Sequence, residues 1–183
     1  LHGEKVEIIH SYKNMLDKKP VSVFLLILAV LFVWFWNIKP LYINEKISYI
    51  DSLISTQRCD KGILMSEKLW QKSGILKTYS ALNFANFLKN CAEGNPQKEL
   101  EYAQKSIEAL KKASVMQSKN SRIWIFMGGF TNVLAAKEKN PEEKSQKILQ
   151  ARQYLEKALE LSPQRIEALI QLGINYKLAG DYK

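Results

Sequence analysis

The sequence has 183 residues, a formal net charge of +9 and a hydrophobic content of 46%. This length allows one domain of ordinary size with an additional segment. Lysines and glutamates are interspersed over most of the chain, as in "EEKSQK", which is typical of solvated helix faces. Because no basic block is interleaved with aromatic residues, we expect no nucleic-acid binding.

Residues 1–19 are polar with a few apolar positions and are predicted to form a juxtamembrane segment. His2 and His10 lie in this segment without a cysteine or an acidic cluster at ligand spacing, so no metal site is predicted. The first residue is leucine rather than methionine, so we expect the sequence to be part of a longer chain.

The stretch "VSVFLLILAVLFVWFWNI", Val21–Ile38, contains no ionisable residue. At about 1.5 Å per residue it spans roughly 27 Å as a helix, close to the hydrocarbon thickness of a bilayer. Aromatic residues cluster at its end, where amphipathic rings favour the membrane interface. A transmembrane helix over residues 20–39, in contact with membrane lipid, is therefore predicted; the alternative is a buried core helix.

A cleaved signal peptide is a further alternative for the same stretch. Its apolar run starts late, and the bulky "WFWNIKP" stands where small residues mark cleavage, so a retained anchor is favoured. The lysines on the two sides slightly favour a cytoplasmic N-terminal side. We thus expect a single span in a bacterial-type cytoplasmic membrane, with the following domain outside the cytoplasm.

The rest of the chain has helical punctuation and no strand-like alternation. Pro40 is expected to kink the helix, and residues 40–58 are predicted to continue as a connecting amphipathic helix. Turn residues then separate further predicted helices at 60–71, 76–91, 96–117, 121–139, 141–161 and 164–183. The fold class is therefore all-α: one transmembrane helix followed by antiparallel helix pairs.

The last two helices carry a repeat motif. In "QRIEALIQLGINYKLAGDYK", Leu169 is followed by Leu172, Gly173 and Tyr176, the first-helix pattern of a tetratricopeptide (TPR) repeat, and "AGDY" matches the turn that follows. The preceding helix supplies the second-helix half, at Ala151, Leu155, Ala158 and Pro163. These segments resemble the TPR family, so residues 59–183 are predicted to be a TPR-like solenoid whose last repeat is truncated.

A weaker copy of the motif lies upstream, with Trp124, Met127 and Gly128 in the same first-helix frame. Between Gly128 and Ala151 the spacing exceeds the standard repeat by about three helical turns. That region must either lengthen both helices or loop out.

The motif also predicts packing. Gly173 and Ala158 are expected where two helix backbones approach closely, with Leu169, Leu172, Tyr176 and Leu155 filling the space between them. The far side of the last helix is expected to be exposed and its end frayed, because it forms only half of a repeat. A Gly173→Leu substitution would then destabilise the terminal pair by over-packing, at roughly 1–3 kcal/mol or more.

The first helices of a TPR-like array line its concave face, which suits an extended peptide or a partner helix. Some of the apolar positions could instead pack only against neighbouring helices. The residues predicted to bind a protein or peptide partner are Arg122, Ile125, Phe126, Asn132, Val133, Glu167, Ile170, Gln171, Ile174 and Lys177.

No catalytic constellation, phosphate-binding motif or cofactor site is predicted, so any enzymatic chemistry would lie outside this sequence. Cys59 and Cys91 are almost equidistant from the turn at Gly74, so an antiparallel hairpin would bring them together. A disulfide between them would require an oxidising compartment; two unrelated thiols are the alternative.

Two stretches together suggest a more specific relative. They are "WNIKPLYINEKI", which leaves the apolar span, and "ARQYLEKALELSPQRIEALIQLGINYKLAGDYK". This combination resembles the C-terminal portion of O-antigen ligase/polymerase-like membrane proteins that carry TPR repeats after their last span. The resemblance implies a parent glycosyltransferase that acts on lipid-linked glycans through a part upstream of Leu1, and no catalytic residue is carried over. A stand-alone single-pass TPR scaffold for an envelope complex, without enzymatic activity, is the alternative.

Overall fold

A computed structural model of the chain describes residues 19–181, and all of its regular elements there are helical. The predicted juxtamembrane segment, apart from Lys19, and the last two residues lie outside the described part. The chain divides into two compact units, residues 1–44 and residues 45–183. Each unit is considered by itself below.

The first unit contains the apolar stretch as a helix. It begins with α2 (Lys19–Val33), continues through a five-residue π-helical turn (Trp34–Ile38), and passes into α3 (Lys39–Ser55). The helix from Pro20 to Ser55 has 36 residues, and its most apolar window has a mean hydropathy of 2.5. It therefore has the length and composition of a membrane span; the boundaries at 20 and 39 stay a prediction.

The π-helical turn explains how the helix accommodates Pro40. Proline has no N–H to donate to Trp36, and its ring crowds that carbonyl in a regular α-helix. In the structure the N–H of Lys39 donates instead to the carbonyl of Trp34, which is the wider spacing of a π-turn. The helix thus runs through Pro40, where the sequence predicted a kink.

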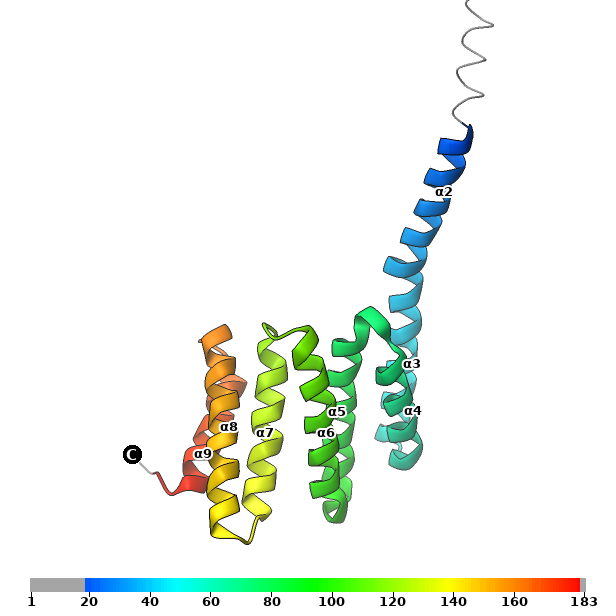
Figure 1. Ribbon diagram of the computed structural model, residues 1–183. Coiled ribbons are helices and arrows are strands. Elements are labelled where there is room, and N and C mark those ends of the chain that lie inside the picture. The colour runs from blue at the N-terminus through cyan, green and yellow to red at the C-terminus, as the bar shows by residue number, and fades with distance from the viewer. Residues whose placement is uncertain (1–18, 182–183) are drawn as a thin grey trace, which may run out of the picture. The chain divides into compact units, whose positions relative to one another are not determined.

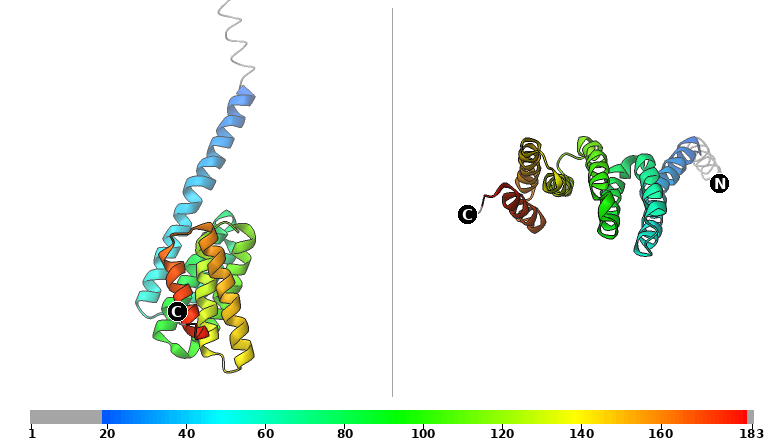
Figure 2. Two further views of the ribbon diagram at one scale, coloured as in Figure 1. Left: turned by 90° about the vertical axis from the view of Figure 1, so that its left-hand side faces the viewer. Right: turned by 90° about the horizontal axis from the view of Figure 1, so that it is seen from below.

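The second unit is an array of antiparallel helices that follow one another side by side in chain order (Figures 1 and 2). It starts with the later part of α3. The other helices are α4 (Cys59–Lys72), η2 (Gly74–Leu76), α5 (Lys77–Gly94), η3 (Pro96–Lys98), α6 (Glu99–Met116), α7 (Ser121–Lys137), α8 (Pro141–Leu161) and α9 (Ile166–Ala179). These bounds lie within a few residues of those predicted from the sequence, because proline, glycine and asparagine stand at the turns.

The extra residues between Gly128 and Ala151 lengthen both helices of one pair. Helix α7 has 17 residues and α8 has 21, and only residues 138–140 join them. Of the two alternatives that the spacing left open, the structure therefore contains the longer helices rather than an extended loop.

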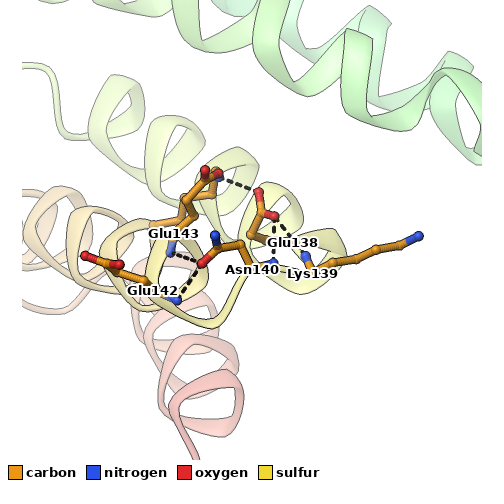
Figure 3. Close-up of polar contacts among 6 residues, drawn as sticks. Glu138, Lys139, Asn140, Glu142 and Glu143 are labelled. Carbon is orange, nitrogen blue, oxygen red and sulfur yellow. Dashed lines mark hydrogen bonds and ion pairs between the residues drawn. The ribbon is translucent and has the colours of Figure 1, made fainter.

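The turn between α7 and α8 is held by side chains (Figure 3). Asn140 caps α8 by accepting hydrogen bonds from the backbone N–H groups of Glu142 and Glu143, at 2.9 and 3.3 Å. Glu138 accepts from the backbone of Lys139 and Asn140 and pairs with Lys147 at 2.6 Å. The hydrogen bond from Lys147, followed by that from Asn140, lowers the pKa of Glu138 to about 2.

One apolar core runs through the array from α3 to α7. Its largest fully buried side chains include Ile50, Phe84, Leu88, Leu110 and Ile123. A smaller cluster of Ile125, Ala158 and Ala168 joins α7, α8 and α9. The C-terminal helix is thus attached through small residues at a close approach of helices, as predicted for Ala158.

Gly128 and Gly173 hold the same motif position, but only Gly128 lies close to a neighbouring helix. A Cβ atom built on Gly128 would lie 2.5 Å from Cγ of Leu155, so α7 and α8 pack closely there. A Cβ atom on Gly173 would meet nothing within 4 Å. The predicted packing at Gly173 is therefore wrong for this chain, because no described helix follows α9 to supply the partner that α8 supplies to α7.

The neighbouring side chains are exposed or half-buried, as expected for the far side of the last helix, so they do not fill the space of a helix pair. Leu169 is 49% exposed and Tyr176 is 38% exposed, and Leu172 is only half-buried. They line an uncovered face of α9 instead of filling a helix pair. Because a Cβ atom on Gly173 meets nothing within 4 Å, the over-packing cost predicted for Gly173→Leu is no longer expected.

Candidate functional site: a groove between α7 and α9

A groove of about 570 Å³ lies on the face formed by the first helices of the successive pairs. Helix α7 contributes one wall and α9 the other, and Lys89 reaches it from α5. The residues that line the groove are Lys89, Arg122, Ile125, Phe126, Gly129, Phe130, Asn132, Val133, Ala136, Arg165, Glu167, Ile170, Gln171, Ile174 and Leu178.

The groove combines an apolar surface with positive charge. Phe126 and Phe130 contact each other along α7 with ring centroids 6.1 Å apart. On α9, Ile170 is 57% exposed and Ile174 is 41% exposed, although both are large aliphatic side chains. Exposed apolar groups in a concave site are typical of a surface that a ligand covers.

Three cationic side chains and one carboxylate complete the lining. Lys89, Arg122 and Arg165 are cationic, and Arg165 Nε lies 3.4 Å from the Glu167 carboxylate. The groove therefore carries an excess of positive charge over an apolar floor, which favours a ligand with aliphatic and acidic groups.

The structure brings together the predicted partner-binding residues with one exception. All of them except Lys177 line the groove, and Leu178 lies there instead. Helix α9 contributes Ile174 and Leu178, four residues apart, to this lining, and the partner-binding role of Lys177 stays a prediction.

Asn132 has a structural role that the sequence did not reveal. Its side chain is 2% exposed, and its Nδ2 donates to the backbone carbonyl of Gln171 at 2.9 Å. Its Oδ1 accepts from Nδ2 of Asn175, also at 2.9 Å. Both polar atoms are thus engaged between α7 and α9, so Asn132 fixes the groove walls and has little left to offer a partner.

Asn175 continues this network into α8. It is fully buried and donates also to the carbonyl of Ile148, at 2.9 Å, while its Oδ1 accepts from Nε of Arg152 at 3.1 Å. Arg152 in turn lies 4.5 Å from the ring centroid of Tyr176 and pairs with Asp181 at 3.1 Å. The polar network therefore joins α7, α8 and α9 behind the groove.

Sequence reasoning missed two cationic residues of the groove. Lys89 lies in α5, whose repeat frame could not be fixed from "TYSALNFANFLKN", and Arg165 precedes α9 in the turn. A TPR frame extended to α5 could have found Lys89. Arg165 lies two residues after Pro163 of the motif, so the sequence placed it in the turn before α9 without indicating that it reaches the groove.

The two cysteines lie at adjacent helix ends. Cys59 begins α4 and Cys91 lies near the end of α5, and the structure joins them by a disulfide with Cα atoms 5.8 Å apart. Cys91 is buried in the core. The bond thus joins two neighbouring helices of the array at the end away from Gly74.

No cluster suited to catalysis or metal binding accompanies the groove. Among residues 19–181, no group of three or more histidine, cysteine, aspartate or glutamate side chains could hold a metal ion.

No protein-family model matches the sequence, and no curated protein matches it. Among solved structures, the chain is similar to a thermophilic TPR protein of Thermus thermophilus, with a TM-score of 0.60 and 15% sequence identity. The similarity covers 76% of this chain and 66% of that one. The fold is TPR-like. In such a fold the first helices of the repeats line the concave face, as α7 and α9 line the groove here.

Proposed function

We propose that this chain is a membrane-anchored protein-interaction module that binds an extended segment of a partner protein in the groove between α7 and α9. The observation that carries this proposal is the exposure of Ile170 and Ile174 beside Phe126 in a concave site. Burying such side chains against a partner contributes roughly 25 cal/mol per Å² of apolar surface.

The charge of the groove defines the partner further. Lys89, Arg122 and Arg165 favour a segment that carries carboxylates next to aliphatic side chains. The backing network of Asn132 and Asn175 holds the walls in place before binding, which lowers the entropic cost of association.

A photo-crosslinking experiment tests the groove. A benzophenone amino acid at Ile170 is compared with the same residue at Leu149, since both side chains are 57% exposed and Leu149 lies on α8 outside the groove lining. We expect one discrete crosslinked partner from position 170, mapped by mass spectrometry to an acidic and aliphatic segment. A second variant, Arg122→Glu, should weaken the crosslink; equal crosslinking from both positions would contradict the proposal.

Membrane anchoring rests on the apolar helix. Val21–Ile38 would contact lipid, since the side chains of its most apolar window are exposed throughout and carry no charge. Flotation of the full chain with vesicles after carbonate extraction tests this. A chain that stays at the bottom of the gradient would exclude an anchor.

The repeat unit is proposed to lie outside a bacterial-type cytoplasmic membrane. A disulfide persists in an oxidising compartment, and lysines before the apolar helix favour a cytoplasmic N-terminal side. Protease digestion of spheroplasts tests the sidedness: the repeat unit should be cleaved without permeabilisation, and its protection would reverse the orientation.

Two kinds of parent protein remain under this proposal. The resemblance of "WNIKPLYINEKI" and the TPR segment supports the C-terminal part of an O-antigen ligase/polymerase-like protein, whose upstream part would act on a lipid-linked glycan. The alternative is a single-pass scaffold for an envelope complex. The genomic sequence before Leu1 discriminates them: eight or more apolar spans with a large polar loop support the first, and a start codon just upstream supports the second.

A further inference from the structure

The repeat unit has two edges, each formed by alternate turns. The proximal edge consists of the turns at residues 73–76, 117–120 and 162–165, and the distal edge of those at 56–58, 95–98 and 138–140. The three proximal turns lie together at one side of the array in Figure 1. These two edges differ in apolar exposure and in charge.

Large apolar side chains project into solvent at the proximal edge. Val115 is 86% exposed, Ile166 67%, Ile75 57% and Met116 53%, and Tyr79 at the start of α5 is 45% exposed. These residues lie in the turns or in the adjoining helix ends, and none of them lines the groove. At the distal helix ends of the described chain, Leu100 is 43% exposed and Tyr176 is 38% exposed.

Charge differs between the distal turns and the first two proximal turns, whereas the third proximal turn is flanked by Glu160 and Glu167. The first two proximal turns, with the helix ends beside them at residues 68–80 and 109–124, contain lysine and arginine but no aspartate or glutamate. The distal turns carry Asp60, Glu93, Glu99, Glu138 and Glu142 among their basic residues. Positive charge next to exposed apolar groups, without acidic neighbours, is the composition of a surface that adsorbs to anionic lipid.

Trp70 shows that the first two proximal turns are adjacent in space. The ammonium groups of Lys77, from the start of α5, and Lys112, from the end of α6, lie 5.8 and 5.6 Å from its ring centroid. The exposed groups on either side therefore belong to one continuous surface rather than to separate tips.

The chain also enters the repeat unit from this edge. Helix α3 returns into α4 through residues 56–58, and Ile54 packs on Gly62, so the start of the unit at Glu45 lies toward the C-terminal end of α4. Glu45 follows the last residue of the apolar stretch, Ile38, by seven positions. Seven residues span at most about 25 Å, so the start of the unit stays close to the membrane whatever the angle between the two units.

We infer that the proximal edge rests on the anionic surface of the membrane that holds the chain. Ile75, Val115 and Met116 enter the interfacial region, and Lys72, Lys77, Lys112 and Lys119 meet lipid phosphates. This inference rests on the proposed membrane anchor. Docking of this edge would fix the height of the groove above the bilayer and leave the acidic turns facing away.

Site-specific fluorescence on the full chain tests the inference. An environment-sensitive dye is attached to Val115→Cys or to Leu100→Cys, which lie at opposite ends of α6, about 22 Å apart along the helix. The native cysteines are joined in the disulfide, so labelling is done without reductant. The protein is reconstituted into vesicles of phosphatidylcholine and phosphatidylglycerol that contain a headgroup-spin-labelled lipid as quencher.

The dye at position 115 should be quenched severalfold more than the dye at position 100. The difference should shrink in 1 M salt, where the Debye length is about 3 Å, because lysine–phosphate attraction is then screened. A double variant, Lys72→Gln with Lys119→Gln, should reduce the quenching, whereas Lys61→Gln with Lys139→Gln at the distal edge should not.

The outcomes separate this inference from the anchor on which it rests. Protein that floats with the vesicles after carbonate extraction, with equal quenching at both positions, overturns the edge contact and leaves the anchor intact. Equal effects of the two double variants also overturn it. Protein that does not float removes the anchor and this inference together.

Discussion

Leu155 of α8 lies directly against Gly128 of α7, so closely that a Cβ atom on Gly128 would come within 2.5 Å of its Cγ and 3.3 Å of the Ala151 carbonyl. Leu155 is fully buried, so it cannot move into solvent without losing its packing. This approach sets the distance between the two long helices of the array.

A Gly128→Ala substitution should therefore destabilise the repeat unit. Over-packing costs about 1–3 kcal/mol, which exceeds the gain of up to about 1 kcal/mol that alanine brings to a helix. Chemical denaturation monitored by circular dichroism measures the free energy of unfolding.

Gly173→Ala provides the matched control for this substitution. A Cβ atom there meets nothing within 4 Å, so only the helix propensity changes and stability should rise by up to about 1 kcal/mol. Loss of stability in the Gly173 variant, or none in the Gly128 variant, would contradict the packing described for the two positions.

The buried Asn175 offers a second prediction. Asn175→Ala removes the partner of Asn132 Oδ1, of the Ile148 carbonyl and of Arg152 Nε at one step. Leaving a buried polar group without a partner costs about 1–3 kcal/mol. Relative to wild type, the substitution should increase the rate of amide hydrogen exchange in α9 more than in α5. Asn83→Ala is the control, because its amide bonds Tyr79 within its own helix; an effect of equal size there would mean that the network adds nothing.

The disulfide can be checked directly by thiol titration. Purified under non-reducing conditions, the folded protein should show no reactive thiol and two after denaturation with reductant. With a sequence separation of 32 between the cysteines, the chain-entropy estimate for the stabilisation is about 3–4 kcal/mol. The reduced protein should have a lower melting temperature than the oxidised protein. A Cys59→Ser/Cys91→Ser double variant should have the same melting temperature as the reduced protein. Two thiols titrating before reduction would rule out the bond.

Glu138 predicts a dependence of stability on acid pH. Its pKa of about 2 lies below the ordinary value of about 4.3, chiefly because Lys147 donates to its carboxylate. The stabilisation from this group is thus fully present above pH of about 4.3 and is lost as the pH falls toward 2. Glu138→Gln should flatten the stability curve in that window, whereas Glu156→Gln, at an exposed position of α8, should leave it unchanged. An identical curve for wild type and Glu138→Gln would show that the pair contributes no pH-dependent stability.

The helices and most of the groove follow from the sequence, because both depend on local patterns. Asn140 and Pro141 determine the start of α8 through capping. Gly128 and Leu155 stand at motif positions of the repeat, so the sequence indicates that their helices pack together. The groove residues of α7 and α9 follow from the same frame.

The features that the sequence did not predict depend on the neighbours of a residue in space or on residues distant in the chain. Gly173 carries the motif, but a Cβ atom there meets nothing within 4 Å, so the close approach expected from the motif is not found. Asn132 and Asn175 are 43 residues apart and look like ordinary polar positions on separate helices. Their mutual burial arises only when α7, α8 and α9 are packed together.

The disulfide stabilises one end of the array, so unfolding should begin at the other end. In a linear stack each helix depends mainly on its neighbours, so disruption travels from the weaker end. Cys59 and Cys91 fasten the helices next to the apolar segment, whereas α9 is attached to the array by a few small residues and the asparagine network. Under the proposed membrane anchoring and partner binding, tension between the bilayer and the partner should detach α9 first and open the groove. The partner would then be released while α4 and α5, which the disulfide joins, stay folded.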